Sequence, residues 1–137
     1  MDNKLIYKDK VTNEWYFDDR LYILSETDEK GIIIYANEVF CTIAKYKEEE
    51  LLGQPHNIVR HPDMPRTAFK MVWDDIQTKG FWEGYVKNKR SDGGFYWVFS
   101  TIIRKTDASG KITYLSIRNK PNREQVKKAE ALYATLD

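Results

Sequence analysis

Residues 81–118 read FWEGYVKNK RSDGG FYWVFSTIIRK TDASG KITYLSIR, and this stretch decides the fold class. Three runs rich in aromatic and β-branched residues are separated by two short polar turns that contain glycine, a pattern typical of β-strands. Glycine tolerates the positive φ that tight hairpin turns require. The stretch therefore predicts three consecutive antiparallel strands over residues 81–89, 95–105 and 112–118.

A second hairpin is predicted closer to the N-terminus. Residues 21–27 (LYILSET) and 32–35 (IIIY) are apolar runs, and the polar turn DEKG at 28–31 separates them. Two such runs around a turn that contains glycine indicate a hairpin. Together with the three later strands, they predict a five-stranded antiparallel sheet.

The segment between the two groups of strands predicts helices. Asn37 is a favourable N-cap for a first helix, and residues 47–53 (KEEELLG) predict a short acidic helix that ends at glycine. Residues 54–65 contain several prolines and can hold at most one helical turn, because each proline removes a backbone donor. A longer helix with apolar residues at helical spacing follows from Pro65 to Gly80. Short helices that cover one face of such a sheet define an α+β fold.

The two ends of the chain lie outside this plan. Residues 1–19 include the aromatic run Trp15, Tyr16 and Phe17, so we expect a short helix or an extended N-terminal cap rather than a flexible tail. The domain itself covers residues 20–120. Residues 121–137 predict a polar amphipathic helix, and its apolar stripe needs a packing surface. That stripe comprises Val126, Ala129, Leu132, Tyr133 and Leu136.

The composition excludes several classes of protein. The chain of 137 residues has 22 Lys and Arg against 21 Asp and Glu, which argues against a nucleic-acid partner because such proteins carry a basic surplus. No apolar run approaches the roughly 18 residues of a membrane span, and no secretory signal is recognisable. Cys41 is the only cysteine, which excludes a disulfide framework. We expect a single soluble, cytoplasmic domain with no direct membrane insertion.

Residues 53–65, GQPHNIVRHPDMP, form a long and unusual motif, accompanied by VKNKR at 86–90 and FYWV at 95–98. With these motifs, residues 20–135 resemble the PAS domains of bacterial aerotaxis and energy-taxis receptors, which hold FAD without a covalent bond. The resemblance implies a PAS fold, FAD as cofactor, and a redox or energy sensor in signal transduction for aerotaxis. Family members are either fused to a chemoreceptor or short proteins paired with one. We therefore expect a chemoreceptor or other signalling partner, through which the domain would reach the membrane, and a chain that is of the short kind or a fragment.

The same resemblance implies which residues bind the flavin. The positions that match the family's flavin-binding residues are Asn37, Arg60, His61, Asp63, Trp73 and Asn88. We add Phe69, which shares the helical stripe of Trp73, and Trp82, which shares the strand face of Asn88.

These residue types suit a flavin site. The Asn88 amide could satisfy a ring carbonyl and a ring N–H together, and the guanidinium of Arg60 could bind phosphate through its planar fork. Gly84 lies on the same strand face as Asn88, where it would leave room for a ring. Ordinary roles stay open as well: Asn88 can simply end a strand, the tryptophans can be core residues, and Arg60 can pair with Asp63 to hold the loop.

Two other functions stay open. His56 or His61 could ligate haem in a haem or small-ligand PAS sensor, and a cofactor-free PAS module could form a homodimer or dock a partner. No catalytic constellation or metal-ligand spacing is present, so we expect neither an enzyme nor a metal site. His56 stands where light-sensing flavin PAS domains carry a reactive cysteine, so we expect no cysteinyl adduct. Cys41 is expected to pack as a small hydrophobic residue in the first helix.

Overall fold

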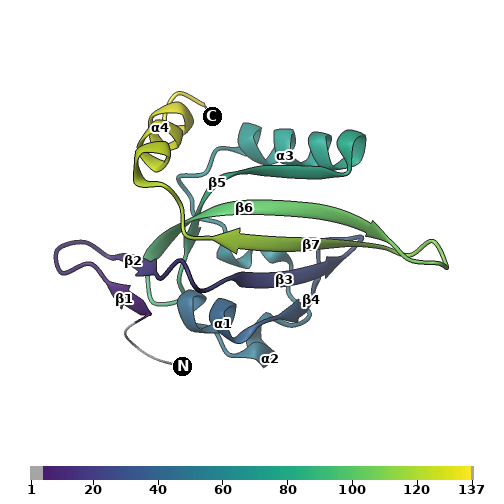
Figure 1. The fold of residues 1–137 in the computed structure, drawn as a ribbon, viewed down its shortest axis with the longest axis horizontal. Helices are drawn as coiled ribbons and strands as arrows, with labels where there is room; N and C mark the ends of the chain where they lie inside the picture. The colour runs from purple at the N-terminus through teal and green to yellow at the C-terminus, as the bar shows by residue number, and fades with distance from the viewer. Residues whose placement is uncertain (1–4, 137) are drawn as a thin grey trace.

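The three strands predicted from residues 81–118 form the middle and one edge of a single sheet in the computed structural model, which describes residues 5–136 (Figure 1). They are β5 (Phe81–Lys89), β6 (Phe95–Thr106) and β7 (Ile112–Asn119), and each pairs antiparallel with the next. The predicted N-terminal hairpin is β3 (Ile23–Asp28) and β4 (Ile33–Ala36), with β3 antiparallel to β7. The strand order β4-β3-β7-β6-β5 confirms the predicted five-stranded antiparallel arrangement.

The sheet has two strands more than the sequence predicted. Residues 5–19 form a hairpin of β1 (Ile6–Lys8) and β2 (Glu14–Phe17), and β2 runs parallel to the start of β6. Side-chain packing explains why this segment joins the sheet. Phe17 is buried in the core, and the indole of Trp15 lies 3.6 Å from the guanidinium carbon of Arg90. Of the two forms expected for the N-terminal segment, the described part takes the extended one.

The register of the sheet decides which side chains share its inner face. Ser25 on β3 is paired with Ser116 on β7, and Ser100 on β6 is paired with Arg118 on β7. Asn88 on β5 is paired with Tyr96 on β6. Because paired residues point to the same side of a sheet, polar groups from four strands meet on one face.

Helices between β4 and β5 cover that inner face, as predicted. They are α1 (Glu38–Ala44), α2 (Glu48–Leu51), the 3-10 helix η1 (His56–Val59) and α3 (Arg66–Lys79). Asn37 caps α1 by accepting a hydrogen bond from the Phe40 amide, and Gly80 ends α3 in the left-handed conformation at φ 84°. The core lies between α1, α2 and the sheet, and includes Ile23, Ile33, Phe40, Ile43, Leu51 and Val98.

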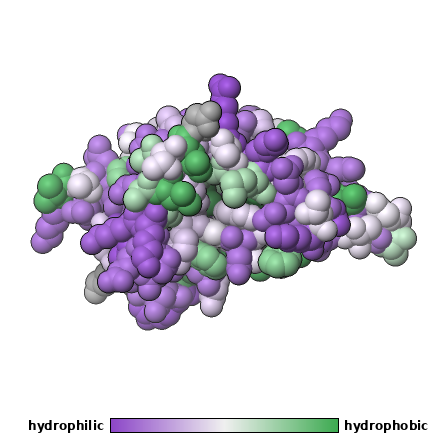
Figure 2. Space-filling view, turned by 90° about the horizontal axis from the view of Figure 1, so that it is seen from above, coloured by the Kyte–Doolittle hydropathy of each residue, from purple (hydrophilic) through white to green (hydrophobic). Residues whose placement is uncertain are grey.

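The C-terminal helix α4 (Arg123–Tyr133) begins at the Asn122 N-cap and packs beside β5. The Tyr133 hydroxyl donates to the Tyr85 carbonyl over 2.7 Å, and the Tyr133 ring stacks on Trp97. The predicted stripe is only partly buried: Val126 is buried, whereas Leu132 is 56% exposed. Figure 2 shows apolar side chains around a hollow between α4 and α3. None of the helices described is long and apolar enough to cross a membrane.

Candidate cofactor-binding site

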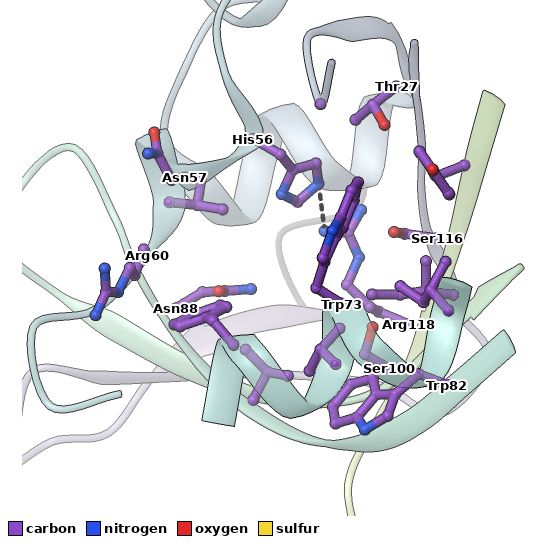
Figure 3. Close-up of a pocket in the computed structure, with 18 residues that line it drawn as sticks. Thr27, His56, Asn57, Arg60, Trp73, Trp82, Asn88, Ser100, Ser116 and Arg118 are labelled. Atoms are coloured by element: carbon purple, nitrogen blue, oxygen red, sulfur yellow. Dashed lines mark hydrogen bonds between the residues drawn. The ribbon is translucent and has the colours of Figure 1, made fainter. Parts of the chain in front are cut away.

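A cavity of about 400 Å³ lies between the inner face of the sheet and helix α3 (Figure 3). Its walls are mostly apolar, with a few polar groups placed among them, which is the usual composition of a cofactor pocket. The apolar walls include Phe69, Val72, Trp73, Ile76, Val86 and Ile102. The polar groups include His56, Arg60, Asn88, Ser100, Ser116 and Arg118.

The structure brings five of the eight predicted site residues to this cavity. Three parts of the fold supply them: the loop after η1, helix α3 and strand β5. The five are Arg60, Phe69, Trp73, Trp82 and Asn88. Asn37, His61 and Asp63 do not line the cavity.

Trp73 lies at the rim of the cavity and is not a core residue. Its side chain is 49% exposed, and its ring centroid lies 5.6 Å from that of Tyr114 on β7. A half-exposed indole beside an apolar slot leaves a ring face available to a ligand. The geometry therefore favours a binding role over the core role that the sequence also allowed.

Arg60 is held at the cavity by backbone and aromatic contacts. It donates to the Met64 carbonyl over 3.1 Å, and its guanidinium carbon lies 4.7 Å from the centroid of the Phe69 ring. A backbone bridge also joins Arg60 to Asn88 on β5. Its Nε is buried without a hydrogen-bond partner. The alternative in which Arg60 pairs with Asp63 is wrong.

Asp63 instead pairs with Lys87, whose Nζ lies 2.8 Å from the carboxylate. The hydrogen bond from Lys87 holds the pKa of Asp63 below its ordinary value. His61 Nδ1 accepts from the Asp63 backbone amide, so it stabilises the same loop. Asn37 uses its side chain for backbone contacts, including donation to the Tyr22 carbonyl over 2.9 Å. These three residues hold the frame around the cavity.

Gly84 does leave room for a ring, but the ring is that of Trp82. A Cβ on Gly84 would lie only 2.5 Å from an atom of the Trp82 indole. The indole therefore folds back over its own strand and separates the cavity from the hollow beside α4, which Trp82 also lines. Trp97, on the neighbouring strand β6, packs on Tyr133 and lies outside the cavity.

The functional residue that the sequence analysis missed is Arg118. Its side chain is 2% exposed, and its terminal nitrogens reach Ser25 Oγ at 2.6 Å and His56 Nε2 at 3.2 Å. The Phe40 ring also lies 4.5 Å from its guanidinium carbon. No carboxylate among residues 5–136 pairs with it. The alternation Tyr114, Ser116, Arg118 could have revealed it, because it puts a charged residue on the inner face of a central strand.

Burial determines the charge states of Arg118, His56 and Tyr96 beside the cavity. Burial lowers the pKa of Arg118 to about 10, so the guanidinium stays charged at neutral pH. Burial and the Arg118 charge lower the pKa of His56 to about 3, so its ring is neutral. Burial raises the pKa of Tyr96 to about 12, and its hydroxyl lies beside the Asn88 side chain on the paired strand. The cavity thus carries one buried positive charge that nothing in the described chain neutralises.

The sheet with helices over one face defines an α+β domain, and the mostly apolar cavity between the two layers has the composition of a ligand pocket. The profile of the PAS fold matches residues 33–118, and the chain belongs to this family. The match includes β4, all the helices that cover the sheet, and nearly the whole of the cavity.

Among proteins of known function, the chain is similar to the aerotaxis receptor of Escherichia coli (strain K12), with 40% identity over 87% of the chain. It is also 31% identical, over 66% of its length, to the nitrogen fixation regulatory protein of Klebsiella oxytoca. The chain spans only 24% and 18% of these two proteins. The resemblance to aerotaxis-receptor PAS domains is thereby confirmed.

Solved structures share the fold. A PAS domain from Colwellia psychrerythraea has a TM-score of 0.67 at 23% identity, covering 77% of this chain and 91% of that one. A light-oxygen-voltage domain studied with a flavin analogue has a TM-score of 0.69 at 23% identity, covering 80% of this chain and 84% of that one. At this level of identity the likeness establishes the PAS fold alone.

Proposed function

We propose that the cavity binds FAD and that the domain is a redox sensor that passes the state of the flavin to a chemoreceptor or other signalling partner. The observation that carries this proposal is the buried, charged Arg118, which lies in a mostly apolar slot and has no carboxylate partner among residues 5–136. An unpaired buried charge costs free energy, so a protein keeps it where a ligand offers the opposite charge.

The residues present fit a flavin. Asn88 offers a carbonyl oxygen and an NH₂ group from a strand that lines the cavity, which suits the hydrogen-bonding edge of the ring. The buried Nε atoms of Arg60 and Arg118 have no hydrogen-bond partner among the described residues. Apolar walls from α3 and the sheet suit a flat aromatic group, with Trp73 at the rim.

A bound flavin would supply reversible uptake of electrons, which makes its ring more negative or adds a proton to it. The role of Arg118 follows from Coulomb's law, because a fixed positive charge favours the more negative state of a ring beside it. Arg60, at the other end of the cavity, suits the phosphates of FAD, since a guanidinium binds phosphate through its planar fork.

For His56, the haem alternative is disfavoured by two contacts of one ring nitrogen. His56 Nε2 is within hydrogen-bond distance of both Ser25 Oγ and Arg118, so that nitrogen's lone pair is occupied. A haem ligand needs this lone pair free. The cofactor-free module remains the main competitor, either as a homodimer or docked on a partner.

The first test is the visible spectrum of the purified protein and its titration with FAD. We expect a yellow protein, or a colourless one that takes up FAD with the bands of bound flavin. A Soret band would support haem, and a colourless protein that binds no flavin would support the cofactor-free module.

The contribution of Arg118 is tested by Arg118→Met, with Arg104→Met as the matched control. Arg104 lies outside the cavity and donates to the Gln77 carbonyl. We expect Arg118→Met to reduce the preference for reduced over oxidised FAD by at least about tenfold, since charge-assisted hydrogen bonds contribute roughly 1.5–3 kcal/mol. Equal preferences in the two variants would contradict the proposed role of Arg118.

The ligand class is tested at Arg60. Arg60→Ala should weaken FAD by about one to two decades, because it removes the cation proposed for the phosphates. Riboflavin, which has no phosphate, should be weakened much less. Equal weakening of the two ligands would mean that Arg60 only supports the loop through Met64 and Phe69.

A further inference from the structure

Ser25 does not line the cavity, yet it contacts Arg118 and His56, two polar residues that do line it. It sits on β3 with 0% exposure. Its Oγ lies 2.6 Å from the terminal nitrogen Nη2 of Arg118 and 3.0 Å from His56 Nε2. Figure 3 marks the third side of this triangle, the contact of 3.2 Å between Arg118 and His56. Two buried side chains, Ser25 and Arg118, and the partly buried His56 thus form a closed set of polar contacts.

The hydrogen-bond donors and acceptors that each side chain can offer determine which atom donates in each of the three contacts. An arginine side chain only donates, so the nitrogen of His56 that faces it must accept. Nε2 is that nitrogen, and a neutral His56 therefore carries its proton on Nδ1. Ser25 accepts from Arg118, which leaves its single hydroxyl proton to donate to His56 Nε2. In this arrangement His56 Nε2 accepts from both Arg118 and Ser25, which share its single lone pair.

The set also fixes the direction of Arg118. Two of its nitrogens are held from behind by Ser25 and His56, and the Phe40 ring lies against the guanidinium. Its Nε is buried without a partner. Without Ser25, one of the two polar anchors would be lost, and the long side chain would regain rotamers that the native contacts exclude.

From this geometry we infer that Ser25 is a positioning residue. Its hydroxyl holds the Arg118 guanidinium in place at the wall of the cavity. Together with Arg118, it also keeps His56 in the tautomer with the proton on Nδ1. The part that concerns the ligand rests on the proposed function, because it needs a flavin beside Arg118. The part that concerns His56 holds for the protein without any ligand.

The test with ligand compares Ser25→Ala with Ser91→Ala. Ser91 donates its hydroxyl to the Lys45 carbonyl and neither lines the cavity nor contacts Arg118 or His56. In the FAD-loaded protein we expect Ser25→Ala to keep the flavin and to lower its midpoint potential by about 30 mV, which is a tenfold change for a two-electron couple. Ser91→Ala should leave the potential at the wild-type value. Equal potentials in all three proteins would overturn the positioning role, whereas an effect of Arg118→Met alone would leave the proposed function standing.

The test without ligand uses long-range ¹H–¹⁵N NMR of the histidine rings in the flavin-free protein. Wild type and Ser91→Ala should show a neutral His56 with an unprotonated Nε2, and Ser25→Ala should show a mixture of the two tautomers. A protonated Nε2 in the wild type, or an unchanged spectrum in Ser25→Ala, would contradict the inference. If Ser25→Ala does not fold, Ser25→Thr decides, because it keeps the hydroxyl and should retain both wild-type signatures.

Discussion

At the scale of single residues, a substitution of Trp73 can distinguish a binding role from a packing role. A buried aromatic typically costs about 3–5 kcal/mol when truncated to alanine. Trp73 is 49% exposed, so Trp73→Ala should cost well below that range while it lowers the occupancy of FAD. Circular dichroism, urea unfolding and flavin content, measured on one sample, give all three quantities.

The matched control for Trp73 is Met71→Ala. Met71 lies two residues earlier on α3, is 58% exposed and does not line the cavity. It should change neither the fold nor the flavin content. Full flavin occupancy in Trp73→Ala would remove Trp73 from the site.

The lowered pKa of His56 predicts how the free energy of unfolding of the flavin-free protein depends on pH. Its folded pKa of about 3 lies below the ordinary value of 6.5, so between these pH values the unfolded chain binds one more proton than the folded one. Its contribution is therefore fully present above pH 6.5 and is lost as the pH falls, by about 1.4 kcal/mol per pH unit. We expect urea unfolding between pH 7 and pH 5 to show this slope.

His56→Gln should flatten that slope. Burial also lowers the pKa of His61, so His61→Gln serves as the comparison and should flatten the slope less, because His61 is only partly enclosed. A wild-type slope retained in His56→Gln would show that His56 is not held neutral in the fold.

At the scale of elements, α4 is attached at both of its ends. Near its start, Arg123 pairs with Glu14 of β2 at 2.9 Å, and at its end Tyr133 donates to the Tyr85 carbonyl of β5. The hollow beside it, between α3, α4 and β5, has a volume of about 500 Å³. The helix is therefore held by a few separate contacts and not by a continuous apolar interface.

Removal of one such contact should loosen α4 and leave the sheet intact. Tyr133→Phe deletes the hydrogen bond to Tyr85 and should cost about 1 kcal/mol. Hydrogen exchange should become faster in residues 123–133 and stay unchanged in β3 and β7. Tyr35→Phe, at an exposed position on β4, is the control and should alter neither segment. Unchanged exchange in α4 of Tyr133→Phe would show that this contact does not hold the helix.

At the scale of the whole molecule, a redox sensor needs two states that differ beyond the cavity. The segments attached by few contacts are the β1–β2 hairpin and α4. Asp63 and its partner Lys87 of β5 line a second pocket together with residues of α4. We expect hydrogen exchange in residues 5–20 or 120–136 to differ between the oxidised and reduced FAD-loaded protein. Identical exchange in every segment would leave a bound flavin without a route to a partner.

The sequence predicted those parts of the molecule that depend on local pattern. The glycine turns, the alternation of β5 to β7, the Asn37 cap and the end of α3 at Gly80 all follow from neighbouring residues. The pairing of β2 with β6 could not be predicted, because a parallel register between distant segments has no local signal. The same holds for the contact of Ser25 with Arg118, which joins residues 93 positions apart.

The same distinction between local patterns and long-range contacts applies to the candidate site. Residues on one helix or one strand, such as Trp73 and Asn88, could be placed from periodicity and from the resemblance to aerotaxis-receptor PAS domains. The partners of Asp63 and Arg60 could not, since Lys87 and Met64 meet them only through the fold.

The most direct measurement of the central claim is an FAD titration of two variants on β7, Ser116→Phe and Ile117→Phe. The Ser116 side chain faces the cavity, whereas Ile117, one residue further, faces the other side of the sheet. Circular dichroism confirms that each variant is folded. We predict that Ser116→Phe fills the cavity and abolishes FAD binding while Ile117→Phe binds like the wild type. Wild-type affinity in a folded Ser116→Phe would contradict the claim that this cavity holds the flavin.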